Sequence, residues 1–587
     1  MSPDPGATGR AGQRSRLAFA WRMARGDRMA WVTSLVNALF THFFRALLPI
    51  VYALVVDQVI THRDLSLVPA LALCFAMMLA ANEGLFAIGH VSWVYKVTDF
   101  DAKVRRRIFR RILSARSESL ERRKTGDLAE TVETDAQQIT WYVDELGIWI
   151  PDAFIGLVIA LLFMGAISPL LALLAAIAAP LTAFLSHLMG LRGRRVADAY
   201  RTRYGGYSSW LFEVIRGAAD LQQMGATTTV ARWLVARLRG LIHLKVRQSL
   251  VELSSERVRE LVATVLEIAF FVAVSALVLS DRLSIGGYIA VATYFLTARD
   301  ELSKISDDLF QMRIYSVGVD RIRDVMDLPS EHDRGPALDA APRAVVFDDV
   351  RFRYRQDVPV LEGISLRVEP GEQVAIVGGS GAGKSSIVTL LARLRDSESG
   401  SVMIGEHNVA HYSRTSVRRW FGFVQQDPLI FSDTVRANLC LEATNESAER
   451  ISDQLLWEAC RVAQISDTVH RFPDSLDTLI GSEGRTLSAG EKQRLELARV
   501  LLRQPTVLVI DEGLSAVDPD TERSIYRRLF GADRCRSTII IAHRLSSIID
   551  CQRILVLDGG VIAASGSHDE LIRDCAAYQR LFREQVE

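Results

Sequence analysis

A glycine-rich segment in the last third of the chain has residue types and spacing suited to binding phosphate. The segment GGSGAGKS, residues 378–385, fits the pattern GxxxxGK[ST] and lies between the strand-like QVAIVG and the helix-like SIVTLLARL. Glycines allow backbone N–H groups to surround phosphate oxygens, and the N-terminus of the following helix adds positive potential. We predict a nucleotide site in which Lys384 reaches the β- and γ-phosphates and Ser385 binds Mg²⁺. The predicted nucleotide-binding residues of this loop are Gly378, Gly379, Ser380, Gly381, Ala382, Gly383, Lys384, Ser385 and Ser386.

A pair of acidic residues follows a second strand-like segment. The apolar run VLVI immediately precedes Asp511 and Glu512. A buried strand that ends in two carboxylates suits a Mg²⁺ ligand, here Asp511, and a general base for an attacking water, here Glu512. Two solvated acids at a strand end are the alternative, and the pair alone does not decide between the two interpretations.

Between these two segments lies LSAGE, residues 487–491, at the start of the helix-like KQRLELARVLL. With this segment the chain resembles the ABC transporter superfamily, whose signature is LSGGQ. The resemblance implies that Leu487, Ser488, Ala489, Gly490 and Glu491 act in trans on ATP held by a second chain. Ala489 and Glu491 replace the usual glycine and glutamine, so the segment forms either a working signature or the weaker site of a heterodimer.

The resemblance also implies roles for residues elsewhere in the last third. Tyr354 in RFRY would stack on adenine, Gln426 in VQQDP would contact Mg²⁺, and His543 in IIIAHRL would contact the γ-phosphate. Each could instead be an ordinary edge-strand aromatic, surface amide or buried histidine, but their order and spacing favour the family roles. The implied catalytic residues are Glu512, His543, Lys384 and Gln426, the implied Mg²⁺ ligands Ser385, Gln426 and Asp511, and the implied dimer contacts Ser515 and Asp518 in SAVD.

Long apolar runs dominate the first half of the chain. Hydrophobic residues make up 49% of the 587 residues, and the mean hydropathy is positive. Each run has about the 20 residues that a bilayer crossing needs. We therefore predict six membrane spans rather than the core helices of a soluble protein. They are expected at residues 29–60, 65–95, 141–167, 170–191, 261–280 and from residue 285 onward.

The charge of the loops predicts the orientation of these spans. The loops after the second and fourth spans are long and basic, with KVRRRIFRR in one and RGRR in the other, whereas the remaining loops are short and almost free of Lys and Arg. Basic loops stay on the cytoplasmic side. Both termini, both long loops and the nucleotide site are therefore expected in the cytoplasm. The formal net charge of zero gives no reason to expect a nucleic-acid partner.

These patterns predict a polytopic α-helical membrane domain of the ABC exporter type I, followed by an α/β P-loop NTPase domain. The expected divisions are a disordered N-terminus at 1–19, a membrane domain at 20–326, a Pro-rich linker at 327–343 and an ATP-binding domain at 344–587. The resemblance, which includes TGD at 125–127, places short coupling helices near 126–134 and 212–217. The six cysteines show no CxxC spacing and are expected to be reduced thiols.

Ionisable residues also occur inside the predicted spans. Counted from the extracellular turns, Arg45, Glu83, Glu267 and the triplet 299–301 lie roughly 20–27 Å deep at 1.5 Å per residue. Ionisable groups at such depth face a cavity or one another. One interpretation is internal ion pairing, for instance of Arg45 with Glu83. The other is a cavity formed by Arg45, Glu83 and Glu267 that receives an amphiphilic substrate, with a mild preference for a cationic head group.

The function implied by the resemblance is ATP hydrolysis that drives a substrate across the cytoplasmic membrane. Export or flipping of a lipid, drug or peptide is favoured, with ATP and Mg²⁺ as cofactors. The expected partners are a second half-transporter, identical or related, the lipid bilayer and an unidentified substrate. The alternatives are an importer built on the exporter fold, with siderophore-like cargo, and a nucleotide-gated regulator with little hydrolysis, against which Glu512 and His543 argue.

Overall fold

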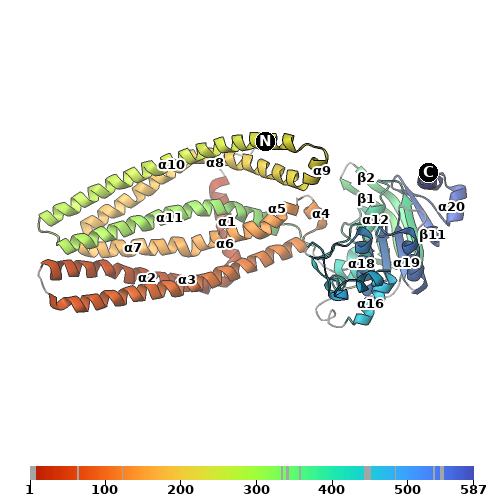
Figure 1. The fold of residues 1–587 in the computed structure, drawn as a ribbon, viewed down its shortest axis with the longest axis horizontal. Coiled ribbons are helices and arrows are strands. Elements are labelled where there is room, and N and C mark those ends of the chain that lie inside the picture. The colour runs from red at the N-terminus through yellow and green to blue at the C-terminus, as the bar shows by residue number, and fades with distance from the viewer. Residues whose placement is uncertain are drawn as a thin grey trace. The chain divides into compact units, whose positions relative to one another are not determined.

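The chain forms two compact units in the computed structural model, and each is described by itself (Figure 1). One unit comprises Met1–Ser114 and Arg123–Leu328 and is helical; the other comprises Ala115–Arg122 and Pro329–Glu587 and contains the sheets. The structure describes all residues except 1–7, 62–64, 122, 124, 332–334, 339–342, 356–357, 442–450, 483, 533–535, 543–547 and 587. Only the backbone is described at 8–15, 27–30, 61, 65, 178–198, 201–202, 209, 252, 255–256, 259, 355, 531–532, 582 and 584–586.

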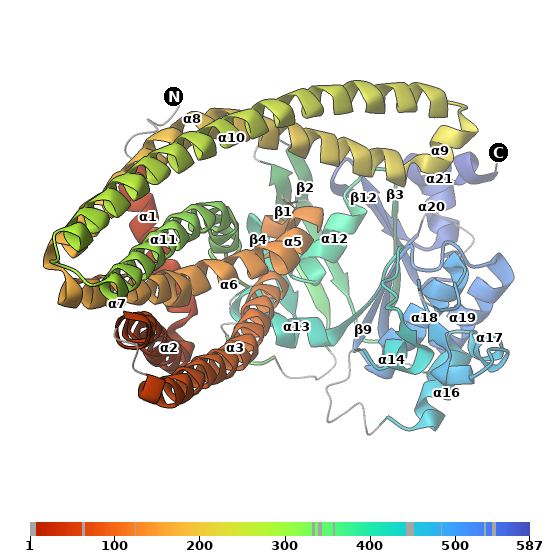
Figure 2. The same cartoon turned by 60° about the vertical axis from the view of Figure 1, so that its left-hand side comes forward.

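The helical unit consists of long helices that lie side by side in pairs. Figures 1 and 2 both show α2 beside α3, α7 beside α11 and α8 beside α10. At 1.5 Å per residue the 46-residue α3 is ~70 Å long, against ~30 Å for the hydrocarbon core of a bilayer. The long basic loops are thus largely helical continuations of the spans. The helices are α1 (Thr8–Met23), α2 (Arg28–Leu54), α3 (Val68–Leu113), α5 (Thr125–Glu130), α6 (Ala136–Asp144), α7 (Ile150–Ile167), α8 (Pro169–Arg216), α9 (Ala218–Gln223), α10 (Thr227–Leu279) and α11 (Ile285–Met326).

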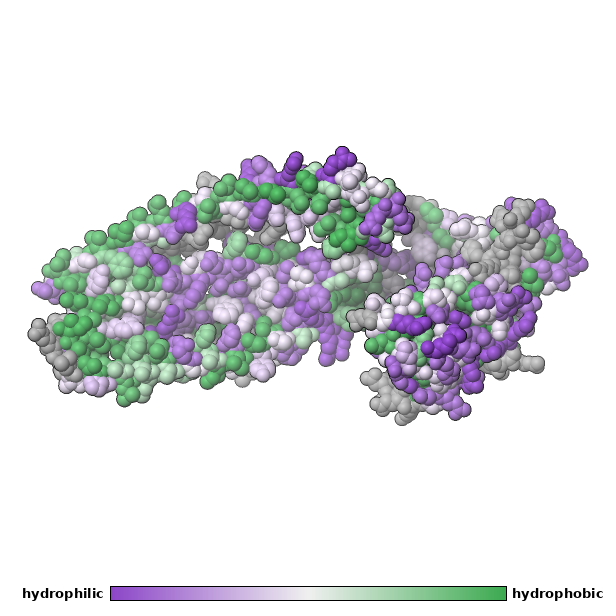
Figure 3. Space-filling view, in the orientation of Figure 1, coloured by the Kyte–Doolittle hydropathy of each residue, from purple (hydrophilic) through white to green (hydrophobic). Residues whose placement is uncertain are grey.

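Apolar side chains gather over one end of the helical unit. In Figure 3 they lie over the left-hand ends of α2, α7, α10 and α11, whereas hydrophilic side chains are more frequent toward α5 and α6. Among the described residues, four helical stretches are long and apolar enough to cross a membrane: Trp31–Ile60, Val68–Leu113, Thr125–Ile167 and Glu260–Leu279. They contain the predicted third span and all but one to three terminal residues of the predicted first, second and fifth spans. The predicted fourth and sixth spans fall on α8 and α11.

Two expectations about the helical unit need correction. The N-terminal segment, expected to be disordered to residue 19, is helical from Thr8 because it has an apolar side: Phe19, Ala20 and Met23 are buried. Arg16 on this helix donates to Asp320 of α11 at 2.8 Å. The first coupling helix was expected near 126–134, but that range lies in α5 and the turn after it, within the helical unit.

A different short helix belongs to the sheet-containing unit. Helix α4 (Ser117–Glu121) lies in Ala115–Arg122, the segment between α3 and α5 that clusters with residues 329–587. Ala115 forms a β-bridge with Ser330, and the Arg116 N–H donates to the Pro329 carbonyl at 3.0 Å. In the second long loop, α8 continues to Arg216, so the short helix α9 follows the expected 212–217 rather than coinciding with it.

The sheet-containing unit has an α/β core and an antiparallel sheet. A six-stranded sheet has the order β12-β11-β3-β10-β9-β6, with β12 antiparallel to β11 and the other neighbours parallel. A four-stranded antiparallel sheet has the order β2-β1-β4-β5. The strands of these two sheets are β1 (Val345–Arg355), β2 (Val358–Val368), β3 (Gln373–Gly378), β4 (Ser399–Ile404), β5 (His407–Asn408), β6 (Phe421–Val424), β9 (Val507–Asp511), β10 (Ser537–Ile541), β11 (Arg553–Asp558) and β12 (Val561–Gly566).

Helices cover this core and bury its thiols. Among them are α12 (Lys384–Leu391), α13 (Arg414–Trp420), α18 (Ala489–Leu502), α19 (Pro519–Ala532) and α21 (Ala576–Val586). The cysteines that the structure describes are free thiols, and Cys460 and Cys551 are buried among apolar side chains. Burial raises the pKa of each of these two thiols to about 12, so both stay protonated and unreactive at neutral pH.

The described part of the predicted linker lies against this unit. Glu331 accepts from the Arg418 guanidinium at 2.8 and 2.9 Å, and the Leu338 N–H donates to Ser416 Oγ at 3.1 Å. Ser413 N–H donates to the Pro336 carbonyl at 3.0 Å. These bonds fix the chain on α13 before it enters β1.

Replacing Gly286 tests the contact between α2 and α11. A Cβ at Gly286 would lie 2.3 Å from the Ala53 carbonyl, which is backbone and cannot move aside. Gly286→Ala is therefore expected to destabilise the helical unit by about 1–3 kcal/mol, the usual cost of overpacking. Gly84→Ala in α3 is the control, because a Cβ there meets nothing within 4 Å. Thermal unfolding in detergent should show a lower Tm for the first variant only; equal Tm values would contradict the close approach.

Candidate nucleotide-binding site

The predicted phosphate loop lies between a buried strand and a helix. β3 ends at Gly378, and α12 begins at Lys384 with Gly383 as its N-cap. Gly381 and Gly383 have φ of +79° and +104°, which favour glycine, and a Cβ at Gly378 would lie 2.2 Å from the Leu557 carbonyl. These glycines let the loop turn tightly and leave its backbone N–H groups available for an anion.

Lys384 lies inside this loop. Its Nζ donates to the carbonyls of Gly378 and Gly379 at 2.8 and 2.9 Å, and the residue is buried. Burial lowers the pKa of Lys384, while the nearby carboxylates of Glu512 and Asp511 oppose that shift. β3 and β9 flank β10, and Ile541 of β10 is level with Ile376 of β3 and with Asp511 of β9. The structure thus brings together the two segments from which the sequence predicts the site.

The acidic pair lies where parallel strands end. Asp511, the last residue of β9, is level with Ile541 of β10, and Ile510 is level with Val424 of β6. Glu512 follows with φ of +51°, and its N–H donates to the Ile541 carbonyl at 3.0 Å. A left-handed backbone at a residue with a side chain costs about 1–2 kcal/mol. Such strain is a feature of functional sites, and here it turns the chain sharply after the strand.

The signature segment forms the start of α18. Ser488 is the N-cap, and its N–H and Oγ both donate to Glu491 Oε2, at 2.8 and 2.9 Å. The Glu491 N–H lies 3.3 Å from Ser488 Oγ and completes a capping box. The substitution of glutamine by Glu491 therefore has a local structural role. Leu487 is buried, and a Cβ at Gly490 would lie 2.7 Å from the Ala516 carbonyl.

Gln493 connects three segments of the predicted site, although no motif in the sequence indicates it. Its Nε2 donates to the Gln426 carbonyl at 2.9 Å and lies 3.3 Å from Ser515 Oγ, while its Oε1 accepts from the Ala516 N–H at 2.9 Å. One buried amide on α18 thus holds the VQQDP and SAVD segments together. One helical turn later, Glu496 accepts from the Gln425 N–H at 2.8 Å. The helix carries several other polar residues, so the sequence does not set Gln493 and Glu496 apart from them.

The remaining predicted residues have different environments. Tyr354 is half-exposed near the end of β1, with its hydroxyl 3.3 Å from Ser386 Oγ. The Gln426 side chain is exposed. Asp518 caps α19 by accepting from the Thr521 N–H at 2.9 Å, and this bond lowers its pKa. His543 lies outside the described residues.

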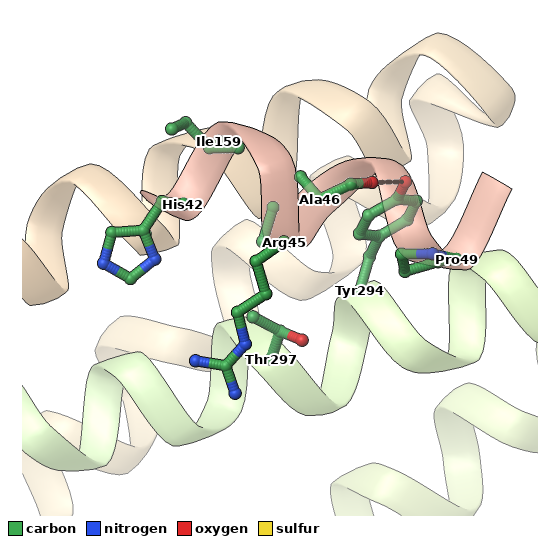
Figure 4. A pocket seen from close by; sticks show the side chains of 9 residues that line it. His42, Arg45, Ala46, Pro49, Ile159, Tyr294 and Thr297 are labelled. Atoms are coloured by element: carbon green, nitrogen blue, oxygen red, sulfur yellow. Dashed lines mark hydrogen bonds between the residues drawn. The ribbon is translucent and has the colours of Figure 1, made fainter. Parts of the chain in front are cut away.

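The ionisable residues of the helical unit do not form the expected ion pair of Arg45 with Glu83. Arg45 Nη1 lies 4.0 Å from Glu301 and does not pair with Glu83, because its side chain points toward α11 (Figure 4). Glu267 accepts from Arg299 at 2.8 Å. Glu83 is exposed on α3. Internal ion pairing therefore holds for Arg45 and Glu267, with partners on α11.

A small cavity lies beside Arg45. It has a volume of about 20 Å³, and its lining includes His42, Arg45, Tyr294 and Thr297. Tyr294 donates to the Ala46 carbonyl, shown dashed in Figure 4, and His42 Nε2 lies 3.3 Å from Asp152. Glu83 and Glu267 do not line it. The cavity has room for about one water molecule, so it is too small to hold a substrate.

A phosphate loop, strand-end carboxylates and a signature helix in one unit, together with a unit of long apolar helices, define an ATP-driven membrane transporter. The chain is a member of the ABC transporter superfamily, with the half-transporter architecture of one membrane domain and one ATP-binding domain. Residues 361–515 match the ABC transporter family, and residues 31–301 match the ABC transporter transmembrane region.

The relatives and the solved structures agree with this assignment. The chain is 29% identical to an "ATP-dependent lipid A-core flippase" of Idiomarina loihiensis, over 90% of each chain. It is 27% identical to the "Alpha-hemolysin translocation ATP-binding protein HlyB" of Escherichia coli, over 96% of this chain and 79% of that protein. A structure of "a bacterial Atm1-family ABC exporter with ATP bound" matches with a TM-score of 0.83 and 26% identity, over 95% and 98% of the two chains. The fold is that of an ABC exporter. The chain binds ATP and couples its hydrolysis to export or flipping, and the importer alternative gains no support.

The bridging role of Gln493 can be measured by replacing its amide. Gln493→Leu keeps similar bulk but leaves the Gln426 carbonyl and the Ala516 N–H without their partner, which costs about 1–3 kcal/mol. ATP hydrolysis is expected to fall roughly tenfold or more, because the two segments lose their shared anchor. The control is Gln579→Leu on α21, whose amide also donates to backbone carbonyls, those of Ile572 and Arg573. If both variants hydrolysed ATP at the parental rate, Gln493 would be a packing residue only.

Proposed function

We propose that this chain works as one half of a dimer that closes around two ATP molecules. Each ATP would lie between the phosphate loop of one chain and the 487–491 segment of the other. The observation that carries the proposal is that the phosphate loop after β3 and the carboxylates Asp511 and Glu512 at the end of β9 lie at the same edge of one sheet, where they would form one half of a hydrolytic site. The second chain would be another copy or a related half-transporter.

The residues at this edge of the sheet fit a Mg²⁺ ion. Mg²⁺ binds through one or two carboxylates together with phosphate oxygens, and Asp511 lies where it could supply one of them. Ser385 at the start of α12 and the exposed Gln426 would be further ligands. When bound, the ion would neutralise charge on the phosphates. Lys384 would turn from the carbonyls of its own loop to the phosphates.

The other roles follow from position. Glu512 would accept a proton from the attacking water, His543 would contact the γ-phosphate, and Tyr354 would stack on the adenine. Ser488 and the N–H of Gly490 would face the γ-phosphate of the ATP held by the partner chain. Ser515 and Asp518 would contact the partner. Because Glu491 accepts from Ser488 Oγ, the serine would have to rotate its hydroxyl to donate to phosphate.

The chain is a multi-pass membrane protein, and we place it in the cytoplasmic membrane with both termini and the ATP-binding unit in the cytoplasm. The basic extensions of α3, α8 and α10 support this orientation. For the substrate we propose an amphiphilic molecule. The half-exposed Arg45 and Arg299, each beside a carboxylate on a neighbouring helix, would offer polar contacts within an apolar surround.

The role of Glu512 is tested in the purified transporter in lipid. Glu512→Gln is expected to bind ATP but to lose about 10²–10⁴-fold in turnover, because a general base is removed. The ATP-bound variant should also accumulate as a closed dimer. Asp520→Asn, a similar charge loss at an exposed residue of α19, is the control and should hydrolyse ATP normally. Near-normal hydrolysis by a dimer in which both chains carry Glu512→Gln would remove this residue from the role.

A further inference from the structure

Arg395 has two contacts that connect Tyr354 to helix α4. The centre of its guanidinium lies 4.9 Å from the centroid of the Tyr354 ring, within the range of a cation–π interaction. The same guanidinium donates through Nη2 to the carboxylate of Glu121 in α4. Arg395 itself follows α12, the helix of the phosphate loop. The guanidinium of Arg395 therefore contacts both Tyr354, the predicted adenine platform, and α4, which lies between α3 and α5 in the sequence.

The surroundings of Arg395 restrict it to this position. Its side chain is only 13% exposed, whereas that of Glu121 is 57% exposed. A guanidinium so far removed from water needs a counter-charge, and Glu121 supplies one. Arg is suited to this double contact because its planar group can lie over a ring and bond a carboxylate at its edge. A lysine could keep the charge but would lose the flat face.

The Tyr354 ring is held from other sides as well. It meets the Phe352 ring edge-on, with centroids 4.8 Å apart and planes at 80°. Its hydroxyl lies near Ser386 Oγ and Thr389 Oγ1 of α12, at 3.3 and 3.5 Å. Phe352 and α12 belong to the core of the unit. Of these contacts of the Tyr354 ring, the one with Arg395 depends on α4. A change at α4 can therefore reach the ring through this arginine.

We propose that Arg395 is a positioning residue that links adenine recognition at Tyr354 to the docking of residues 115–122. When Glu121 holds Arg395, the guanidinium stabilises the ring in place for stacking. By thermodynamic reciprocity, adenine on the ring strengthens the docking of the 115–122 segment by the same factor. This inference rests on the role proposed for Tyr354. It adds that the base of the nucleotide, and not only its phosphates, strengthens the docking of the segment between α3 and α5.

The test compares ATP with inorganic tripolyphosphate, which has the phosphates but no base. Both compete with a fluorescent nucleotide for full-length transporter in lipid, without Mg²⁺ to prevent turnover. Glu121→Gln is expected to raise the Kd of ATP about three- to tenfold, the range of a modest cation–π contribution. The Kd of tripolyphosphate should stay within about twofold. Arg395→Lys should do the same while keeping the charge. Glu362→Gln, an exposed carboxylate on β2, is the charge-matched control and should change neither.

A second readout follows the other direction of the linkage. Hydrogen exchange of the peptide containing residues 115–122 should slow when ATP binds, and slow less with tripolyphosphate. In Glu121→Gln this difference between the two ligands should disappear. A merely structural role of Arg395 would weaken both ligands alike and leave no difference between them.

The outcomes separate the two proposals. If Tyr354→Ala weakens ATP binding but Glu121→Gln and Arg395→Lys bind ATP as the parent does, the linkage is wrong and the adenine platform stands. If Tyr354→Ala leaves ATP affinity unchanged, the platform is wrong and the linkage fails with it. Support requires that all three variants weaken ATP, spare tripolyphosphate and abolish the ligand-dependent difference in exchange.

Discussion

The parallel register of four strands is the constraint on which the rest of the site depends. β3, β10, β9 and β6 pair in parallel, so the residues that follow them emerge at one edge of the sheet. This register brings the phosphate loop after β3 beside the carboxylates after β9, although more than 120 residues separate them in the chain. A shift by one residue would turn Asp511 to the other face of the sheet. Burial of β3, β9 and β10 on both faces makes such a shift costly.

Polar contacts join the other segments of the unit to this edge of the sheet. Gln493 and Glu496 of α18 bond the chain after β6, and Gln493 also bonds the segment after Glu512. Helix α18 is therefore fixed to the strand ends that carry the predicted site. In the proposed mechanism, Ser488 at its start would face the ATP of the partner chain. In this mechanism each chain holds half of two sites, so ATP would be hydrolysed only when a second such unit closes on the first.

Local patterns predicted the phosphate loop, the acidic pair and the helix KQRLELARVLL, because each depends on neighbouring residues: glycines, an apolar strand and a helix-like run after LSAGE. Contacts that depend on tertiary packing were not predictable. Gln493, Arg395 with Glu121, and Arg45 with Glu301 join residues far apart in the chain, and no spacing rule indicates them. The N-terminal helix was not predicted because its first residues are polar, and its apolar residues, such as the buried Phe19 and Met23, come only near its end. The range 126–134, expected to hold the first coupling helix, lies within the helical unit, whereas Ala115–Arg122 belongs to the sheet-containing unit through long-range contacts that no local motif indicates.

The sharing of each ATP by two chains is the central claim, and cross-linking tests it directly. One chain, with its native cysteines replaced, carries Ser380→Cys in the phosphate loop, and a differently tagged chain carries Ser488→Cys at the start of α18. The two are assembled together in lipid and oxidised with and without ATP, in the Glu512→Gln background. The account predicts a disulfide-linked dimer bearing both tags that forms in ATP and not in its absence. A linked dimer that forms equally without ATP, or no linked dimer at all while ATP is bound, would contradict it.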